Sequence, residues 1–302
     1  MVTLKGGILG DDIMEVNFKC TSDNLEEIPQ SIIESTGLKF PQAHTNKEDL
    51  SRLAQELKKY KNDTICRVPF CVTVEAEAMG ANIKLGDEKN GPRVNEYGFK
   101  NVEELGNIEE IDLGKGMIKE VLDSVEYLRN ENEVVALNVE GPFTIISSLI
   151  EPRIFYKAIR KNREIVDKFI KVIEDSIVKY ILEGIKKGAR IISYGDPVGA
   201  LDIVGPKIYK EVSGKSTYNI LKRIEGYLDN CIIHLCGKTS TAFEKIGLSK
   251  AEAIEYHEKL TYGEAINDLL RNNKNIKIIG HSCIKRTPFK SKNQIIWNIK
   301  LN

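Results

Sequence analysis

Four apolar, β-branched runs recur along this chain, and each of them ends in a short group of polar or turn-forming residues. The runs are VVALNVEGP, ARIISYGDP, CIIHLCG and IKIIGHSC, which begin at residues 134, 189, 231 and 276. Helical patterns precede them at 117–130, 155–187, 206–228 and 260–273. Strands that are apolar on both faces and alternate with helices are typical of a parallel sheet covered by helices on both sides. The sequence therefore predicts an α/β fold.

The other segments extend this pattern. A helical segment is expected over about 24–60, where Thr45 or Asn46 can cap its second helix, and the run TICRVPFCVTV then predicts a buried strand that ends near Glu75. The stretch at about 80–115 is rich in Gly, Asn, Asp, Glu and Lys, and we expect it to form an excursion or lid. Weaker strand patterns lie at 253–258 and 295–301.

The polar residues that follow the strands are expected to meet in space. In a parallel (β/α)8 barrel the carboxyl ends of all strands lie on one rim, where the active sites of such enzymes are built. On this interpretation residues 1–302 form a single (β/α)8, TIM-barrel-like domain. A doubly wound open sheet is the alternative, although no Gly-x-Gly-x-x-Gly loop follows the first strand.

Charge and composition limit the class of partner. The 302 residues include 44 basic and 44 acidic side chains, so no net positive charge favours nucleic acid or an anionic membrane. No apolar run approaches the roughly 20 residues that span a bilayer, and the first residues lack the apolar stretch of a signal peptide. We therefore expect a cytoplasmic protein that acts on a small molecule or another protein. Its six cysteines are too scattered for a disulfide framework.

Two His-x-Cys steps stand at the ends of predicted strands. His234 and Cys236 are two residues apart, so the period of a strand puts both side chains on one face. His281 and Cys283 repeat the arrangement, and together the four residues offer the nitrogen and sulfur donors that zinc prefers. Four protein ligands would make a structural site, whereas three ligands and an open position would make a catalytic one. Inert, buried histidines and cysteines are the remaining alternative.

Carboxylates at the predicted rim are candidates for binding substrate. Glu75 and Glu77 face the same way if the strand continues through them, and they are expected to bind substrate or to orient a zinc ligand. Glu140 and Asp196 each precede a turn at a strand end, where a substrate contact and an ordinary turn residue are both open. For His281, a fourth zinc ligand, a residue that orients a ligand or the substrate, and a histidine satisfied by backbone are the alternatives.

Several segments resemble the zinc-dependent methylcobamide:coenzyme M methyltransferases, a branch of the uroporphyrinogen decarboxylase superfamily. HLCGKTS at 234–240 is similar to their His-x-Cys-Gly motif, and GHSCIKRTP at 280–288 to their late Gly-x-x-Cys segment. PFCVTVEAEAMGANI at 69–83 is similar to their Pro-Phe-Cys-x-Thr-x-Glu-Ala-Glu-Ala stretch. EGPFTIISSL at 140–149 and SYGDPVGALDIVGPKIY at 193–209 also look like superfamily segments, so the resemblance spans most of the chain.

The resemblance implies a barrel in which His234, Cys236 and Cys283 bind Zn²⁺ and a substrate thiol completes the coordination. It also implies that a methylated corrinoid, a methylcobamide carried on a corrinoid-binding partner protein, donates a methyl group to a thiol or a related acceptor. Zinc removes the proton of a thiol, which is mostly protonated at neutral pH, and so makes it a nucleophile. No catalytic residue beyond the zinc ligands is expected.

Two departures from the family pattern bear on fold and function. The interval between Cys236 and Cys283 is shorter than in the coenzyme M enzymes by on the order of a β/α unit, which predicts a barrel that is shortened or incomplete in its C-terminal half. The Arg-Gln-Ala-Gly-Arg run with which uroporphyrinogen decarboxylases grip their substrate's carboxylates is missing. Methyl transfer is therefore the leading hypothesis. A uroporphyrinogen-type decarboxylase and a non-catalytic corrinoid- or zinc-binding accessory protein are the alternatives.

Overall fold

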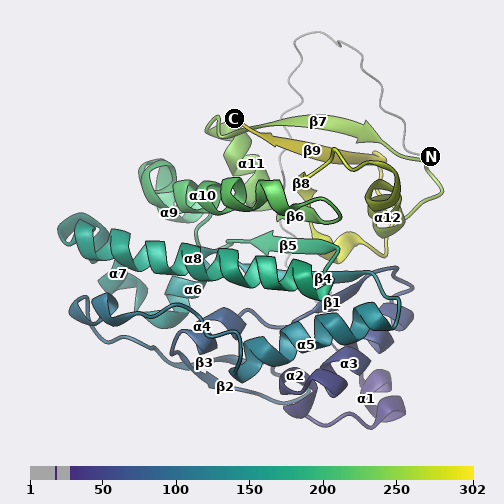
Figure 1. Ribbon diagram of the computed structural model, residues 1–302, viewed down its shortest axis with the longest axis horizontal. Helices are drawn as coiled ribbons and strands as arrows, with labels where there is room; N and C mark the ends of the chain where they lie inside the picture. Colours follow the sequence, from purple (N-terminus) through teal and green to yellow (C-terminus); the bar gives the residue numbers. More distant parts are fainter. Residues whose placement is uncertain (1–17, 19–27) are drawn as a thin grey trace.

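A seven-stranded sheet forms the centre of the computed structural model, which describes Phe18 and residues 28–302 (Figure 1). Its strands are β1 (Cys66–Val68), β4 (Val135–Glu140), β5 (Ile191–Gly195), β6 (Ile232–Cys236), β7 (Ser249–Glu255), β8 (Ile278–Ser282) and β9 (Ile295–Leu301). β1, β4, β5, β6 and β8 are neighbours in that order and run parallel, whereas β9 and β7 continue the sheet in antiparallel pairs. The predicted α/β class with a parallel sheet is confirmed.

Helices pack against both faces of this sheet. The long helices α5 (Gly116–Asn130), α8 (Arg163–Lys187) and α10 (Gly214–Ile224) cover one face, and α12 (Tyr262–Asn272) packs on the other. The shorter helices of this part are α6 (Pro142–Leu149), α7 (Pro152–Lys161), α9 (Leu201–Ile208), the π-helix η2 (Tyr209–Ser213), η3 (Glu225–Tyr227), α11 (Gly237–Lys245) and η4 (Ile284–Arg286). Among the described residues no helix is long and apolar enough to cross a bilayer.

The apolar runs of the sequence are explained by two cores, one on each face of the sheet. Leu137 and Val139 of β4 lie in the larger core, under the long helices. Ala136 points the opposite way and joins Ile191 and Ile232 in a second core beneath α12. Because successive side chains of a strand alternate between faces, a strand buried on both sides must be apolar almost throughout.

The expected N-terminal helical segment is present wherever the structure describes it. It contains α1 (Gln30–Thr36), α2 (Gln42–Thr45) and α3 (Lys47–Tyr60), while 24–27 lie outside the described residues. The side-chain oxygen of Asn46 accepts hydrogen bonds from the backbone N–H groups of Glu48 and Asp49 at 3.0 and 3.1 Å. Asn46 is therefore the cap that starts α3.

The first predicted strand is much shorter than expected. It ends at Val68, and the chain turns into a short helix, α4 (Val74–Ala78), so the prediction of a strand reaching Glu75 is wrong. Pro69 explains the difference, because proline has no N–H group to continue the ladder with β4. The excursion at 80–115 then holds an antiparallel pair, β2 (Asn82–Lys84) and β3 (Arg93–Glu96), and the turn η1 (Glu103–Asn107).

The C-terminal part departs from a regular (β/α)8 order. Of the two weaker strand candidates, β9 has the predicted bounds, whereas β7 begins four residues earlier and ends three residues earlier than predicted, so 256–258 lie outside it. β9 runs antiparallel to both of its neighbours, β8 and β7, because 283–294, between β8 and β9, contains only the short η4 and no helix that could carry a parallel crossover. Within the described residues β1 and β7 are the two edges of the sheet, and no pairing closes it into a barrel.

Candidate active site

The carboxyl ends of the parallel strands form a rim that carries most of the predicted site residues. Glu140 is the partner of Gly195 across β4 and β5, and Cys236 is the partner of Ser282 across β6 and β8. Cys283 follows directly after Ser282. The two cysteines selected from the sequence thus stand at the ends of neighbouring strands, although they are 47 positions apart in the chain.

His234 is buried on β6 and has a protein partner. Its side chain is 1% exposed, and its Nε2 lies 3.1 Å from the hydroxyl of Tyr262, the first residue of α12. Burial lowers the pKa of His234 from 6.5 to about 4, so its imidazole is neutral at physiological pH. A neutral imidazole is the form that binds metal ions.

His281 is turned toward a different helix. The pairing of β6 with β8 is irregular between His234 and Cys236, and His281 there adopts a left-handed backbone conformation with a φ of 55°. Its backbone N–H donates to the Ser240 hydroxyl at 2.8 Å, its Nδ1 lies 3.0 Å from that oxygen, and its Nε2 lies 3.0 Å from a Glu244 oxygen. Both ring nitrogens therefore contact α11, whereas His234 contacts α12.

His234, Cys236 and Cys283 are residue types that bind zinc, but in this structure their side chains are not grouped around one point where an ion could sit. No three His, Cys, Asp or Glu side chains of the described part of the chain form a group that could hold a metal ion. Neighbouring thiols at Cys236 and Cys283 and a neutral imidazole are suitable donors, but the Tyr262 hydroxyl stands at Nε2 of His234. Zinc binding by His234, Cys236 and Cys283 stays a prediction.

The buried carboxyl group of Glu75 and the half-buried Glu140 meet at the end of β4. Glu75 is 1% exposed, and its Oε1 accepts a hydrogen bond from the backbone N–H of Glu140 at 2.9 Å. Burial raises the pKa of Glu75 from 4.5 to about 7. Burial, followed by the charges of Glu75 and Asp196, raises the pKa of Glu140 well above its usual range. These effects favour the protonated form of Glu140, which can donate a hydrogen bond.

Glu77 does not face the same way as Glu75. Both residues lie on α4, where positions two apart point in different directions. Oε2 of Glu77 accepts a hydrogen bond from the backbone N–H of Met117 at 3.2 Å, at the start of α5. The prediction of a shared direction is wrong, because it required a strand where the chain forms a helix.

Asp196 joins the end of β5 to the start of α6. Its carboxylate accepts hydrogen bonds from the backbone N–H groups of Phe143 (3.1 Å) and Thr144 (2.8 Å) and from the Thr144 hydroxyl (2.9 Å). A Cβ atom on Gly141 would lie 2.4 Å from Cβ of Asp196, so this approach requires glycine. Burial raises the pKa of Asp196 from 3.8 to about 6. In the described contacts Asp196 stabilises α6, and its predicted contact with a substrate is untested.

Sequence reasoning missed the residues that hold the two histidines. The Thr261-x-x-Glu264 pattern is a capping box, and both of its hydrogen bonds are present, so it could have located the start of α12 and hence Tyr262. Ser240 and Glu244 are four apart on one helix, which puts them on one face. Nothing in the sequence says that these side chains reach His234 or His281.

Comparison with known proteins shows which family and which relatives this chain resembles. A family model described as "Uroporphyrinogen decarboxylase (URO-D)" matches residues 27–296. The chain is 26% identical over 234 residues to "Methylcobamide:CoM methyltransferase MtaA" of Methanosarcina barkeri, and 25% identical over 231 residues to "Methylcobamide:CoM methyltransferase MtbA" of Methanosarcina mazei. Each match covers 76% of this chain and 68% of the relative.

A solved structure has a similar fold. It is described as a "methyltransferase from Methanosarcina mazei" and superposes with a TM-score of 0.61 at 23% sequence identity. The superposition covers 68% of this chain and 60% of that chain, so the match spans less than two thirds of the solved structure's length. At this identity the likeness concerns the fold alone.

Proposed function

The chain belongs to the uroporphyrinogen decarboxylase family, and from this premise we propose that it is a methyltransferase that moves a methyl group from a methylated corrinoid to a thiol or related acceptor. The observation that carries the proposal is the rim, where Cys236 and Cys283 end neighbouring strands and the neutral imidazole of His234 precedes Cys236 on β6. The similarity to methylcobamide:CoM methyltransferases supports the reaction type. A corrinoid-binding protein is the proposed carrier of the methyl donor.

The proposed metal is Zn²⁺, and its proposed ligands are His234, Cys236 and Cys283. When bound, such an ion holds a substrate thiol as the thiolate at neutral pH. In the described arrangement Nε2 of His234 instead lies beside the Tyr262 hydroxyl. Zinc binding through Nε2, as proposed, therefore requires His234 to exchange this hydroxyl for the metal.

The remaining rim residues are proposed to shape the acceptor pocket. A protonated Glu140 can donate a hydrogen bond to the acceptor without placing a negative charge beside a reacting thiolate. Glu75 positions Glu140 through its backbone N–H, and Asp196 fixes the start of α6 beside it. Glu77 and His281 stay candidates for contacts with the acceptor.

Zinc binding can be tested through the hydroxyl that competes for His234. We expect Cys236→Ala to lose zinc, and Tyr262→Phe to bind it about fivefold more tightly, because one hydrogen bond of about 1 kcal/mol no longer has to be broken. Competition with a chromophoric chelator measures both. Tyr256→Phe is the matched control, since Tyr256 is buried in the same core as Tyr262 but its hydroxyl interacts with Ser291 and not with His234. Equal affinities of the two tyrosine variants, or full zinc content in Cys236→Ala, would contradict the ligand assignment.

Methyl transfer is tested with the full chain, methylcobalamin, and coenzyme M or other small thiols. The expected result is a thiol-dependent loss of the cobalt–methyl absorbance, slowed at least about tenfold in Cys236→Ala. Cys231→Ala is the control, because Cys231 is a buried thiol just before the opposite end of β6. If no thiol accelerates the loss beyond the protein-free rate, methyl transfer is excluded for these acceptors.

A specific observation favours a second candidate function. The C-terminal part of the described sheet departs from a regular (β/α)8 order, and a change of this kind in the scaffold of the rim favours a family member that binds a corrinoid or zinc without catalysis. Corrinoid binding without methyl loss in the same assay would support this accessory role.

Three further expectations from the sequence stay predictions. They are a single domain over residues 1–302, a lid formed by about 80–115, and a cytoplasmic location.

A further inference from the structure

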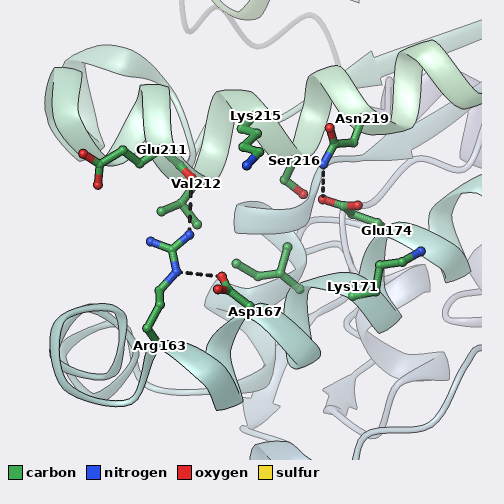
Figure 2. Close-up of a pocket in the computed structure, with 10 residues that line it drawn as sticks. Arg163, Asp167, Lys171, Glu174, Glu211, Val212, Lys215, Ser216 and Asn219 are labelled. Carbon is green, nitrogen blue, oxygen red and sulfur yellow. Dashed lines mark hydrogen bonds and ion pairs between the residues drawn. The ribbon is translucent and has the colours of Figure 1, made fainter.

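A cavity of about 190 Å³ lies between α8 and the segment formed by η2 and α10 (Figure 2). Its lining comes from these helices alone and includes none of the rim residues described above. The charged lining is balanced, with three basic and three acidic side chains: Arg163, Lys171, Lys215, Asp167, Glu174 and Glu211. The cavity is thus a separate, mixed-charge pocket in the helical layer.

The most buried part of the pocket is polar and keeps hydrogen-bonding capacity for a ligand. Glu174 is 6% exposed, and its Oε1 accepts a hydrogen bond from Nδ2 of Asn219 at 3.3 Å. Ser216 is 2% exposed, and its buried hydroxyl interacts with the Glu174 carboxylate, which partly offsets the rise in the Glu174 pKa that burial causes. Figure 2 shows this hydroxyl pointing toward Glu174. A carboxylate can accept about four hydrogen bonds, so this corner is suited to a ligand that donates several.

The basic side chains of the pocket differ in whether they already form an ion pair or a hydrogen bond. Nε of Arg163 donates to Asp167 at 2.6 Å, and its guanidinium also contacts the backbone oxygen of Glu211 at 3.3 Å. Lys171 pairs with Asp175 on the same helix. Lys215 has no ion pair or hydrogen bond within the described residues, and Figure 2 shows its ammonium directed into the space between the two helices. Lys215 is therefore the cation that can meet an anionic group.

One wall of the pocket is a π-helix. Glu211 and Val212 line the pocket from η2, and short π-helical turns occur frequently at functional sites. The same turn carries Tyr209, whose buried hydroxyl has no partner among the described residues. Burial, followed by the charges of Asp196 and Cys236, raises the pKa of Tyr209, and its ring packs edge-on against Phe243 of α11. This element thus contributes both to the pocket and to the surroundings of the candidate active site.

We propose that the cavity binds a small zwitterion of the α-amino acid class, whose ammonium group donates to Glu174 and Ser216 and whose carboxylate meets Lys215. The site is distinct from the rim and does not depend on the reaction proposed there.

Size and charge select this class over others. A volume of about 190 Å³ corresponds to roughly six water molecules in the liquid and is smaller than the roughly 300–1,000 Å³ of most drug-sized pockets. A free inorganic anion is disfavoured, because the charged group deepest in the pocket is the carboxylate of Glu174. A simple cation would leave Lys215 without a partner.

The proposal is tested by calorimetric titration of the full chain with glycine, L-alanine, L-serine and L-cysteine. Methylammonium and acetate serve as probes with one charge each, and inorganic phosphate as a probe for anion binding. We expect at least one amino acid to bind more tightly than all three single-sign probes. Glu174→Gln keeps the shape of the side chain, and we expect it to weaken that binding at least about tenfold, as the loss of a charged hydrogen bond does.

Two further variants complete the test. Lys215→Met should weaken amino acid binding but not methylammonium binding. Because Lys215 is exposed, this variant should fold, so it tests the proposal even if Glu174→Gln does not fold. Glu164→Gln on α8 is the matched control, since Glu164 is 84% exposed and outside the lining. The proposal is overturned if no amino acid binds, if phosphate binds more tightly than every amino acid, or if Glu164→Gln weakens binding as much as the pocket variants do.

Discussion

Single acidic residues at the rim bind their protons unusually tightly. Burial raises the pKa of Glu75 from 4.5 to about 7. The folded protein therefore holds this proton more tightly than the unfolded chain does. The resulting contribution to stability is fully present below pH 4.5 and is lost as the pH rises toward and through about 7.

Replacing Glu75 by Gln tests this pH dependence. The variant keeps an oxygen that can accept the Glu140 N–H but cannot ionise. We expect similar free energies of unfolding for wild type and Glu75→Gln at pH 4.5, and an advantage of about 3 kcal/mol for the variant above pH 7. Urea unfolding across this range measures the difference. Glu96→Gln on the exposed face of β3 should follow the wild-type profile, and a Glu75→Gln profile parallel to wild type would disprove the assignment.

For single residues, the sequence predicts which side chains could bind a metal ion, but not which side chains they contact in the fold. The two-residue step from His234 to Cys236 indicates side chains on one face of β6, because the period of a strand is fixed. The contact between His234 and Tyr262 joins residues 28 positions apart and depends on how α12 packs over the sheet. Pairing at such a distance leaves no local pattern in the chain.

Some side chains connect a strand to a helix by accepting hydrogen bonds from the N–H groups at the start of the helix. The first N–H groups of a helix have no partner within the helix, and in α6 two of them donate to Asp196. Asp196 follows β5, so one carboxylate holds this strand end and the start of α6 together.

Removing this carboxylate should destabilise the fold. We expect Asp196→Ala to lower the free energy of unfolding by about 2–4 kcal/mol, because buried N–H groups of α6 lose their acceptor. Asp196→Asn should lose less, since its amide oxygen still accepts from Thr144. Chemical denaturation measures both. If the alanine and asparagine variants were equally stable, hydrogen bonds to Asp196 would not be the cause.

The bounds of helices and strands with a strong apolar pattern can be predicted from the sequence. The bounds of an element that ends because one backbone N–H group is missing are harder to predict. β4, β5, β6 and β8 follow from long apolar runs, and α3 from its periodicity and its Asn46 cap. The run before Glu75 has the same composition, but a single missing N–H at Pro69 ends the strand early. Because the strand ends early, Glu75 and Glu77 lie on the helix α4, where they point in different directions.

The order of strands in the whole molecule depends on connections that the sequence does not reveal. A short link after β8 makes β9 antiparallel, and β7 then pairs with β9 instead of following β6 as a parallel strand. Strand patterns at 253–258 and 295–301 are visible in the sequence, but the direction and partners of the strands depend on the length and content of the links. This choice leaves two edges in the described sheet, at β1 and β7.

The β7 edge is expected to rely on charge to remain unpaired. Lys250 and Glu252 are exposed there, and charged side chains on edge strands discourage pairing with other molecules. Replacing both by Val should cause self-association, detected by sedimentation velocity. The matched control replaces Glu164 and Lys168, an exposed ion pair on α8, by Val. Equal behaviour of the two double variants would show that the edge has no special role.

The position of β9 between β8 and β7 also constrains the order of assembly during synthesis. β7 leaves the ribosome before β8 and β9, yet its only strand partner in the described sheet is β9. Until 295–301 has been translated, β7 has nothing to pair with and the far side of the sheet is incomplete. The parallel strands β1, β4, β5 and β6 pair in the order in which they are made, so this half can assemble on the nascent chain while the antiparallel half waits for its last strand.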